Sequence, residues 1–231
     1  MKFWRLYNSA EKEVGFVPQI IQPIFQGQYS DQNQLWNVYT GKIDDSTIIP
    51  KGHLHKRANF TDLMSDGFLN NQRFVSNKLR SIIEKYPAEG IQFVHSEIFT
   101  KKAENIPVSI IHPFQTNRLF IDMKRSEFQI ATVFGEIIEE KIKLSTINEF
   151  LEIRENHINE SKMYEDISLH KWISISKLVF NEKVDFEICS VFDVMHGGGV
   201  GYYVSQNLKD DILNAECTGV IFREINERYP N

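Results

Sequence analysis

The glycine-rich segment VMHGGGVGYYV, residues 194–204, has the composition of a loop that could bind an oxyanion or a phosphate. In esterases a His-Gly-Gly-Gly loop lends backbone amides to an oxyanion and works with a Gly-x-Ser-x-Gly nucleophile elbow, which this chain lacks. The dinucleotide fingerprint needs a third glycine where Tyr202 or Val204 stands, and no Walker lysine follows. We therefore expect Gly197 to Gly201 to form a tight bend before the strand GYYV.

Histidines and carboxylates are the other candidates for chemistry. His53 and His55 could lie on one side of a strand as metal ligands, but no third ligand stands at a convincing spacing. Neighbouring carboxylates act as acid and base only in a cleft that separates their pKa values. The sequence thus predicts no catalytic residue, no metal and no cofactor. A hydrolase that assembles His196 with distant residues remains an alternative.

Acidic residues are concentrated in one part of the chain. The net charge is −5, which disfavours a nucleic-acid partner because phosphate contacts need Lys and Arg. Residues 136–166 hold nine acidic and four basic side chains and account for the whole imbalance. This segment is either a solvated helix face or an acidic surface that attracts a basic protein. The candidate partner-binding residues are Glu136, Glu139, Glu140, Glu149, Glu152 and Glu155.

The environment expected for the chain is the cytoplasm. Asn8 and Glu11 to Glu13 interrupt the apolar content of the N-terminus, so a secretion signal is not predicted, and no uncharged apolar stretch is long enough for a membrane span. Cys189 and Cys217 are expected to be buried free thiols.

Alternating helix and strand patterns predict an α+β protein with mixed sheets. The strongest amphipathic helix covers 145–160, with Ile147, Phe150, Leu151 and Ile158 facing inward. Residues 60–72 are expected to form a short helix and a turn. Strands are expected around 91–99, 108–134, 172–180 and 184–194.

One segment occurs twice. FVSNKLRSIIEKYPAEGIQF (74–93) aligns without a gap to YVSQNLKDDILNAECTGVIF (203–222), with identities at Val, Ser, Leu, Ile, Gly and Phe. We expect the serine to cap a helix, Leu and Ile to be buried, the glycine to adopt a left-handed turn and the phenylalanine to fill the core. A strand-helix-strand unit also predicts two parallel strands. The chain is then a single domain, 1–231, whose lobes 1–125 and 126–231 are related by the repeat.

These two copies, together with RLFIDMKRSEF (118–128), resemble immunity proteins of bacterial polymorphic toxin and contact-dependent inhibition systems. The similar members end in a V-S-x-x-L helix followed by a T-G-[VI]-x-F strand. The resemblance implies a cytoplasmic protein without catalysis of its own that binds a cognate toxin domain and blocks it. Many such toxins are nucleases with basic surfaces, which an acidic inhibitor suits. It implies no residue-level site, and it leaves the oligomeric state open.

A second alternative is an adaptor module that holds another partner through exposed aromatic side chains. Trp4, Trp36 and Trp172 would be its contact residues, although packing in the core or at its rim explains them equally well.

Overall fold

The computed structural model describes most of the chain and divides it into two compact units. Unit 1 comprises Met1–Thr116, Phe186–Ser190 and Tyr202–Arg223, and unit 2 comprises Asn117–Asp185, Val191–Gly201 and Glu224–Asn231. The described residues are 1–24, 27–28, 32–38, 41–102, 104–115, 118–132, 134, 136–161, 166, 170–191 and 201–225.

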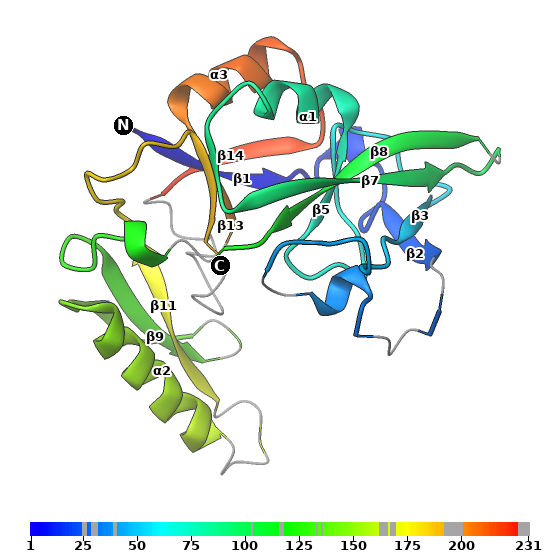
Figure 1. Cartoon of the computed structure of the whole chain (residues 1–231). Helices are drawn as coiled ribbons and strands as arrows, with labels where there is room; N and C mark the ends of the chain where they lie inside the picture. Colours follow the sequence, from blue (N-terminus) through cyan, green and yellow to red (C-terminus); the bar gives the residue numbers. More distant parts are fainter. Residues whose placement is uncertain are drawn as a thin grey trace. The chain divides into compact units, whose positions relative to one another are not determined.

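The α+β class is confirmed. Unit 1 contains a five-stranded and a six-stranded sheet (Figure 1). The first has the order β14 (Val220–Glu224), β1 (Phe3–Asn8), β13 (Gly201–Ser205), β12 (Ile188–Val191), β6 (Ala88–Glu89). The second has the order β2 (Ile20–Ile24), β3 (Lys51–Leu54), β7 (Ile91–Phe99), β8 (Asn105–Pro113), β5 (Arg73–Ser76), β4 (Leu63–Met64). The helices are α1 (Asn77–Ile83), α3 (Gln206–Asn214) and the short 3-10 helices η1 (Lys12–Val14) and η2 (Leu35–Asn37).

One isolated bridge links the two edges of the six-stranded sheet. Ile20, at the start of the edge strand β2, donates its N–H to Ser65 O at 3.0 Å and accepts the N–H of Gly67 at 3.1 Å, just after the other edge strand, β4. This bridge pairs backbone groups that an open edge would expose. The core inside this sheet includes Ile20, Leu35, Trp36, Met64, Leu69, Phe74, Ile98, Val108 and Ile110.

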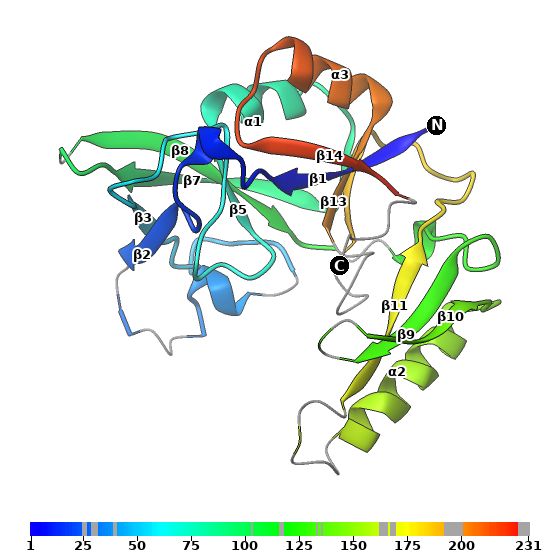
Figure 2. The ribbon, with the colours of Figure 1, turned by 180° about the vertical axis from the view of Figure 1, so that it is seen from behind.

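The repeated segment forms α1 and α3, which lie side by side (Figures 1 and 2). The predicted caps, buried aliphatic residues and glycine turns are confirmed. Ser76 and Ser205 cap the helices. The Oγ of each serine accepts the N–H of the residue three positions later, Leu79 at 3.1 Å and Leu208 at 3.2 Å. The leucines and isoleucines Leu79, Ile83, Leu208 and Ile212 are buried. Gly90 and Gly219 have φ of 71° and 74°, in the left-handed region.

The strands around each helix also correspond. β5 and β7 both pair antiparallel with β8, which lies between them, so these two strands are parallel as predicted. In the second copy β13 and β14 flank β1, and β13 pairs with it antiparallel. The chain's first strand therefore fills the place that β8 fills in the first copy.

Two features of the structure differ from the expectations drawn from the sequence. Residues 60–72 form β4 and turns rather than a helix, because the chain there bonds with Thr218, Ser76 and Ile20 instead of with its own next turn. Phe93 and Phe222 are half-buried and do not fill the core. The guanidinium carbon of Arg80 lies 5.6 Å from the centre of the Phe93 ring, and Lys209 Nζ lies 6.0 Å from the centre of the Phe222 ring.

Both copies of the repeat lie in unit 1. The division into lobes 1–125 and 126–231 stays a prediction. The two compact units divide the chain at other positions.

Unit 2 contains one three-stranded antiparallel sheet and one long helix. The strand order is β10 (Ile137–Ile142), β9 (Glu127–Thr132), β11 (Lys171–Lys177), and the chain also forms η3 (Arg118–Phe120). The helix α2 (Ile147–Ser161) packs against β11 (Figure 2). Within the described ranges, no helix has the length and apolar character needed to cross a membrane.

Candidate protein-binding surface

Three of the six candidate glutamates lie on α2, and the first of them has a structural task. Glu149 accepts the N–H of Ser145 at 2.8 Å and the hydroxyl of Thr146 at 3.3 Å. In return, the N–H of Glu149 donates to Thr146 Oγ1 at 3.3 Å. This reciprocal pair is a capping box at the start of α2. Glu149 therefore fixes the helix start.

Replacing the capping threonine should destabilise unit 2. Thr146→Ala removes the hydroxyl that accepts from Glu149 N–H, and we expect a loss of about 1 kcal/mol. Thr146→Ser keeps the hydroxyl and should remain within a few tenths of a kcal/mol of the parent protein. Urea unfolding followed by circular dichroism measures both variants, and equal losses would show that the cap contributes nothing.

Glu152 and Glu155 face away from the core of unit 2. The buried side of α2 is marked by Phe150, whose ring lies 5.5 Å from that of Phe128 on β9. At about 100° per residue, Glu152 and Glu155 lie roughly 140 to 160° around the helix from Phe150. Both are exposed. Of the three candidate glutamates on α2, they are the two that a partner can reach without disturbing the helix start.

Ile158 was expected to face inward and does not. It is 39% exposed, because it lies eight residues after Phe150 and is rotated by about 80° from the buried direction. His157 lies closer to that direction; its Nδ1 is 3.3 Å from Glu160 Oε2. An apolar side chain therefore stands on the exposed surface of α2 beside the acidic residues.

Glu136, Glu139 and Glu140 lie at or in β10, the edge strand on the far side of β9 from β11. All three are exposed. Ile138 stands among them and is 50% exposed. Since α2 packs against β11, the predicted surface consists of two groups, one on the edge strand and one on the helix.

Strand β10 is irregular. Its pairing with β9 shifts register twice, between Ile137 and Glu139 and between Glu139 and Ile142. Lys141 has φ of 57°, in a region that side chains other than glycine rarely adopt. Bulges and charged residues prevent another strand from pairing with an edge.

The nearby lysines are partly neutralised within unit 2. Lys143 Nζ lies 3.1 Å from Glu127 Oε1, and this hydrogen bond is the main cause of the lowered pKa of Glu127, with Lys177 and Lys141 adding to it. Glu127 on β9 thus takes up part of the positive charge of these lysines.

The charges of the two units differ. Unit 1 contains 15 acidic and 15 basic residues, whereas unit 2 contains 16 acidic and 11 basic residues. The whole net charge of −5 therefore belongs to unit 2.

Other candidate residues are placed in packing roles or lie outside the described part. His55 stacks on Phe16 with ring centroids 3.8 Å apart, and desolvation followed by the charges of Arg57 and Lys56 lowers its pKa. His53 lies 5.8 Å from the Phe99 ring. Gly197 to Gly199 and His196 are outside the described residues. Within the described ranges no three His, Cys, Asp or Glu side chains are grouped to hold a metal.

The tryptophans and cysteines have defined positions. Trp36 is buried in the core at 3% exposure. Trp4 is half-buried and donates from Nε1 to Gln206 Oε1 at 2.7 Å. Cys189 is buried and Cys217 is half-buried, and both are free thiols. Sequence reasoning missed Asp62 and Glu187, two carboxylates that hold the helix-capping serines of unit 1.

Comparison with known proteins gives no relative: no family model and no curated protein matches the chain.

Proposed function

We propose that this chain is an immunity protein that binds a cognate toxin domain and neutralises it by stoichiometric inhibition. The observation that carries the proposal is the location of the entire net charge in unit 2, on exposed glutamates of β10 and α2. The resemblance of 74–93, 118–128 and 203–222 to immunity proteins supports it independently. The partner is a toxin domain with a basic surface, such as a nuclease.

The surface has the composition of a protein interface. Ile138 and Ile158 are 50% and 39% exposed. Ile138 lies between Glu136 and Glu139 in the sequence, and Ile158 lies on α2 together with Glu152 and Glu155. Interfaces commonly combine an apolar centre with a polar rim. The isoleucines supply area to be buried, and the carboxylates supply complementarity to a basic partner.

Recognition is through side chains. The two register shifts of β10 and the left-handed Lys141 leave a poor template for an added strand. Glu152 and Glu155 project from a helix that the capping box and Phe150 hold in place. The helix α2 and the irregular edge strand β10 thus offer charged side chains to the partner and form no main-chain hydrogen bonds with it.

Charge reversal tests the surface. Glu152→Lys combined with Glu155→Lys, and separately Glu136→Lys combined with Glu139→Lys, should each lower the association rate with the toxin domain about tenfold at low salt. They should also weaken the dependence of that rate on ionic strength. Stopped-flow fluorescence measures both quantities.

A matched control is available in unit 1. Glu11→Lys combined with Asp45→Lys changes the net charge equally at two exposed positions outside unit 2. It should slow association only slightly. If the control and the unit 2 variants slow it equally, the effect is one of total charge and the surface in unit 2 is not the binding site.

A further inference from the structure

The N-terminus of α1 is tied to a carboxylate that precedes it by 14 residues. Ser76 Oγ donates to Asp62 Oδ1 at 2.6 Å while it accepts from Leu79 N–H at 3.1 Å. The backbone adds a second link, since Ser76 N–H donates to Asp62 O at 2.8 Å. The capping serine is therefore held by both the side chain and the backbone of Asp62, which is buried.

The N-terminus of α3 repeats this arrangement with different residues. Ser205 Oγ donates to Glu187 Oε2 at 2.6 Å and accepts from Leu208 N–H at 3.2 Å. Ser205 N–H donates to Glu187 O at 2.8 Å. Each copy of the repeat thus has a serine cap held by an acidic residue outside the aligned segment.

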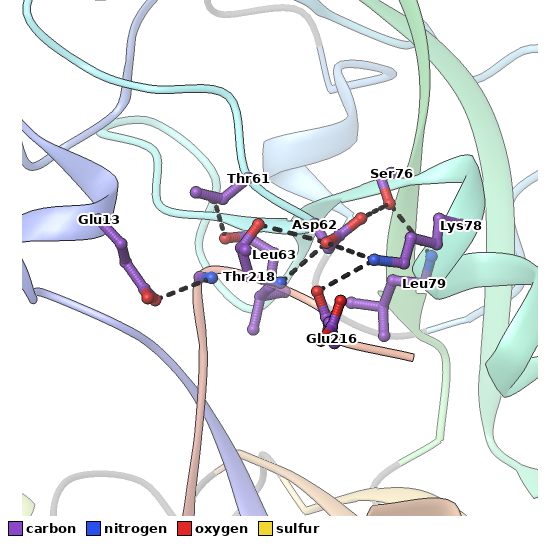
Figure 3. A network of polar contacts seen from close by, with 10 residues as sticks. Glu13, Thr61, Asp62, Leu63, Ser76, Lys78, Leu79, Glu216 and Thr218 are labelled. Carbon is purple, nitrogen blue, oxygen red and sulfur yellow. Dashed lines mark hydrogen bonds and ion pairs between the residues drawn. The ribbon is translucent and has the colours of Figure 1, made fainter. Parts of the chain in front are cut away.

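The turn after α3 bonds to the acidic residue of the first copy (Figure 3). Thr218 N–H donates to Asp62 Oδ2 at 2.8 Å, and the Thr218 hydroxyl lies 3.2 Å from the same oxygen. In the opposite direction the N–H groups of Asp62 and Leu63 donate to Thr218 O at 3.0 and 3.2 Å. Lys78 adds a link between the two copies: its Nζ lies 3.6 Å from Asp62 Oδ2 and donates to Glu216 O at 3.0 Å.

The turn after α1 bonds to the backbone of the acidic residue of the second copy. The N–H groups of Glu187 and Ile188 donate to Pro87 O at 2.8 and 3.3 Å. The chain then continues into β6, which pairs parallel with β12. Each copy therefore contacts the other through the turn that follows its helix, although the bonds differ: Thr218 reaches the carboxylate and the backbone of Asp62, whereas Pro87 reaches the backbone of Glu187 and Ile188. Contacts made in both directions are also the arrangement of a two-fold dimer.

We infer that unit 1 is built as a fused pseudo-dimer with a reciprocal lock, in which the turn that ends each helix bonds to the acidic residue that holds the capping serine of the other helix. The lock couples the two copies, because an acidic residue that loses its bond to the serine also loses the position in which it receives the turn from the other copy. Local opening of proteins spreads through such cooperative units. The lock lies within unit 1 and does not depend on the proposed partner surface.

Amide hydrogen exchange tests the coupling. In Ser76→Ala, exchange should accelerate at least tenfold at Leu79 in α1 and also at Thr218 and Gly219 in the other copy. In Ser205→Ala, it should accelerate at Leu208 and also at Glu187 and Ile188, whose amides bond to Pro87. NMR of the full chain resolves these amides.

Two further variants keep the test decisive. Ser81→Ala makes the same chemical change at an exposed position of α1 and should leave exchange at Thr218 and Gly219 unchanged. Thr218→Val, at an exposed position, removes only the hydroxyl that reaches Asp62 and should accelerate exchange at Leu79 several-fold. Acceleration confined to the copy that carries each substitution would overturn the lock.

Discussion

Gly219→Ala is expected to lower the free energy of unfolding by about 2 to 5 kcal/mol. Gly219 has φ of 74°, where an L residue is strained by about 1 to 2 kcal/mol. An added Cβ would also overlap the backbone carbonyl of Leu63 and the side chain of Thr61. Neither group can move freely, since Leu63 is in β4 and Thr61 Oγ1 donates to Leu63 O at 2.8 Å.

Gly41→Ala separates the two contributions. Gly41 has φ of 98°, and an added Cβ there would meet nothing within 4 Å. Only the backbone strain remains, so we expect a loss of about 1 kcal/mol. Urea unfolding of both variants gives the difference. Equal losses would mean that the close approach of Thr61 and Leu63 to the glycine does not restrict this position.

Asp66→Asn is expected to remove a pH dependence of stability worth about 2 to 3 kcal/mol. Burial raises the pKa of Asp66 to about 6, against a partial opposing effect of Arg73 and of the Leu69 and Phe68 amides. Asp66 Oδ1 accepts those amides, whereas Oδ2 has no hydrogen-bond partner among the described residues. The ionised carboxylate is therefore unfavourable in the folded state.

The sign follows from proton binding. The folded chain keeps the Asp66 proton up to about pH 6, whereas the unfolded chain loses it near 3.8. The stability contributed by this group thus increases as the pH falls from about 7 to about 4. Burial lowers the pKa of His112, which acts in the opposite direction in the same range. The difference between the parent protein and Asp66→Asn isolates Asp66, because His112 is common to both.

Chemical denaturation at pH 4.5 and pH 8 measures this difference. From pH 4.5 to pH 8, the free energy of unfolding of the variant should rise by about 2 kcal/mol relative to that of the parent protein. The asparagine oxygen can still accept the Phe68 and Leu69 amides, so the turn itself is preserved. A difference that stays constant with pH would show that Asp66 does not titrate in this range.

Local signals in the sequence were sufficient for the repeated elements. Serine before an amphipathic run predicted the caps at Ser76 and Ser205, and glycine after it predicted the turns at Gly90 and Gly219, because these features depend on neighbouring residues. The helix expected over 145–160 is α2, shifted by one or two residues. The parallel arrangement of β5 and β7 followed from the crossover rule.

Features that depend on distant residues were not predictable. Asp62 and Glu187 precede their serines by 14 and 18 residues, and neither has a motif of its own. Residues 60–72 have a helix-like pattern, but Leu63 and Met64 pair with β5 as β4, and Asp62 and Leu63 donate to Thr218 O. The strand that completes the second copy is β1, from the other end of the chain, which no local alignment reveals.

The candidate surface was predicted in composition and not in geometry. Acidic residues were expected on one surface; the structure divides the candidates between an edge strand and a helix and gives Glu149 a role at the start of α2. The exposure of Ile158 depends on the exact rotation of α2 about its axis, which is set by the contact between Phe150 and Phe128.

The most direct test of the proposed function pairs this chain with the toxin domain that the proposal expects the neighbouring open reading frame to encode. Cells that express the toxin domain should regain growth when this chain is supplied, and the two proteins should elute as an equimolar complex in size-exclusion chromatography. The folded variant that combines Glu136→Lys, Glu139→Lys, Glu152→Lys and Glu155→Lys should fail to protect. A toxin domain that stays fully active and unbound in the presence of excess folded protein would contradict the proposal.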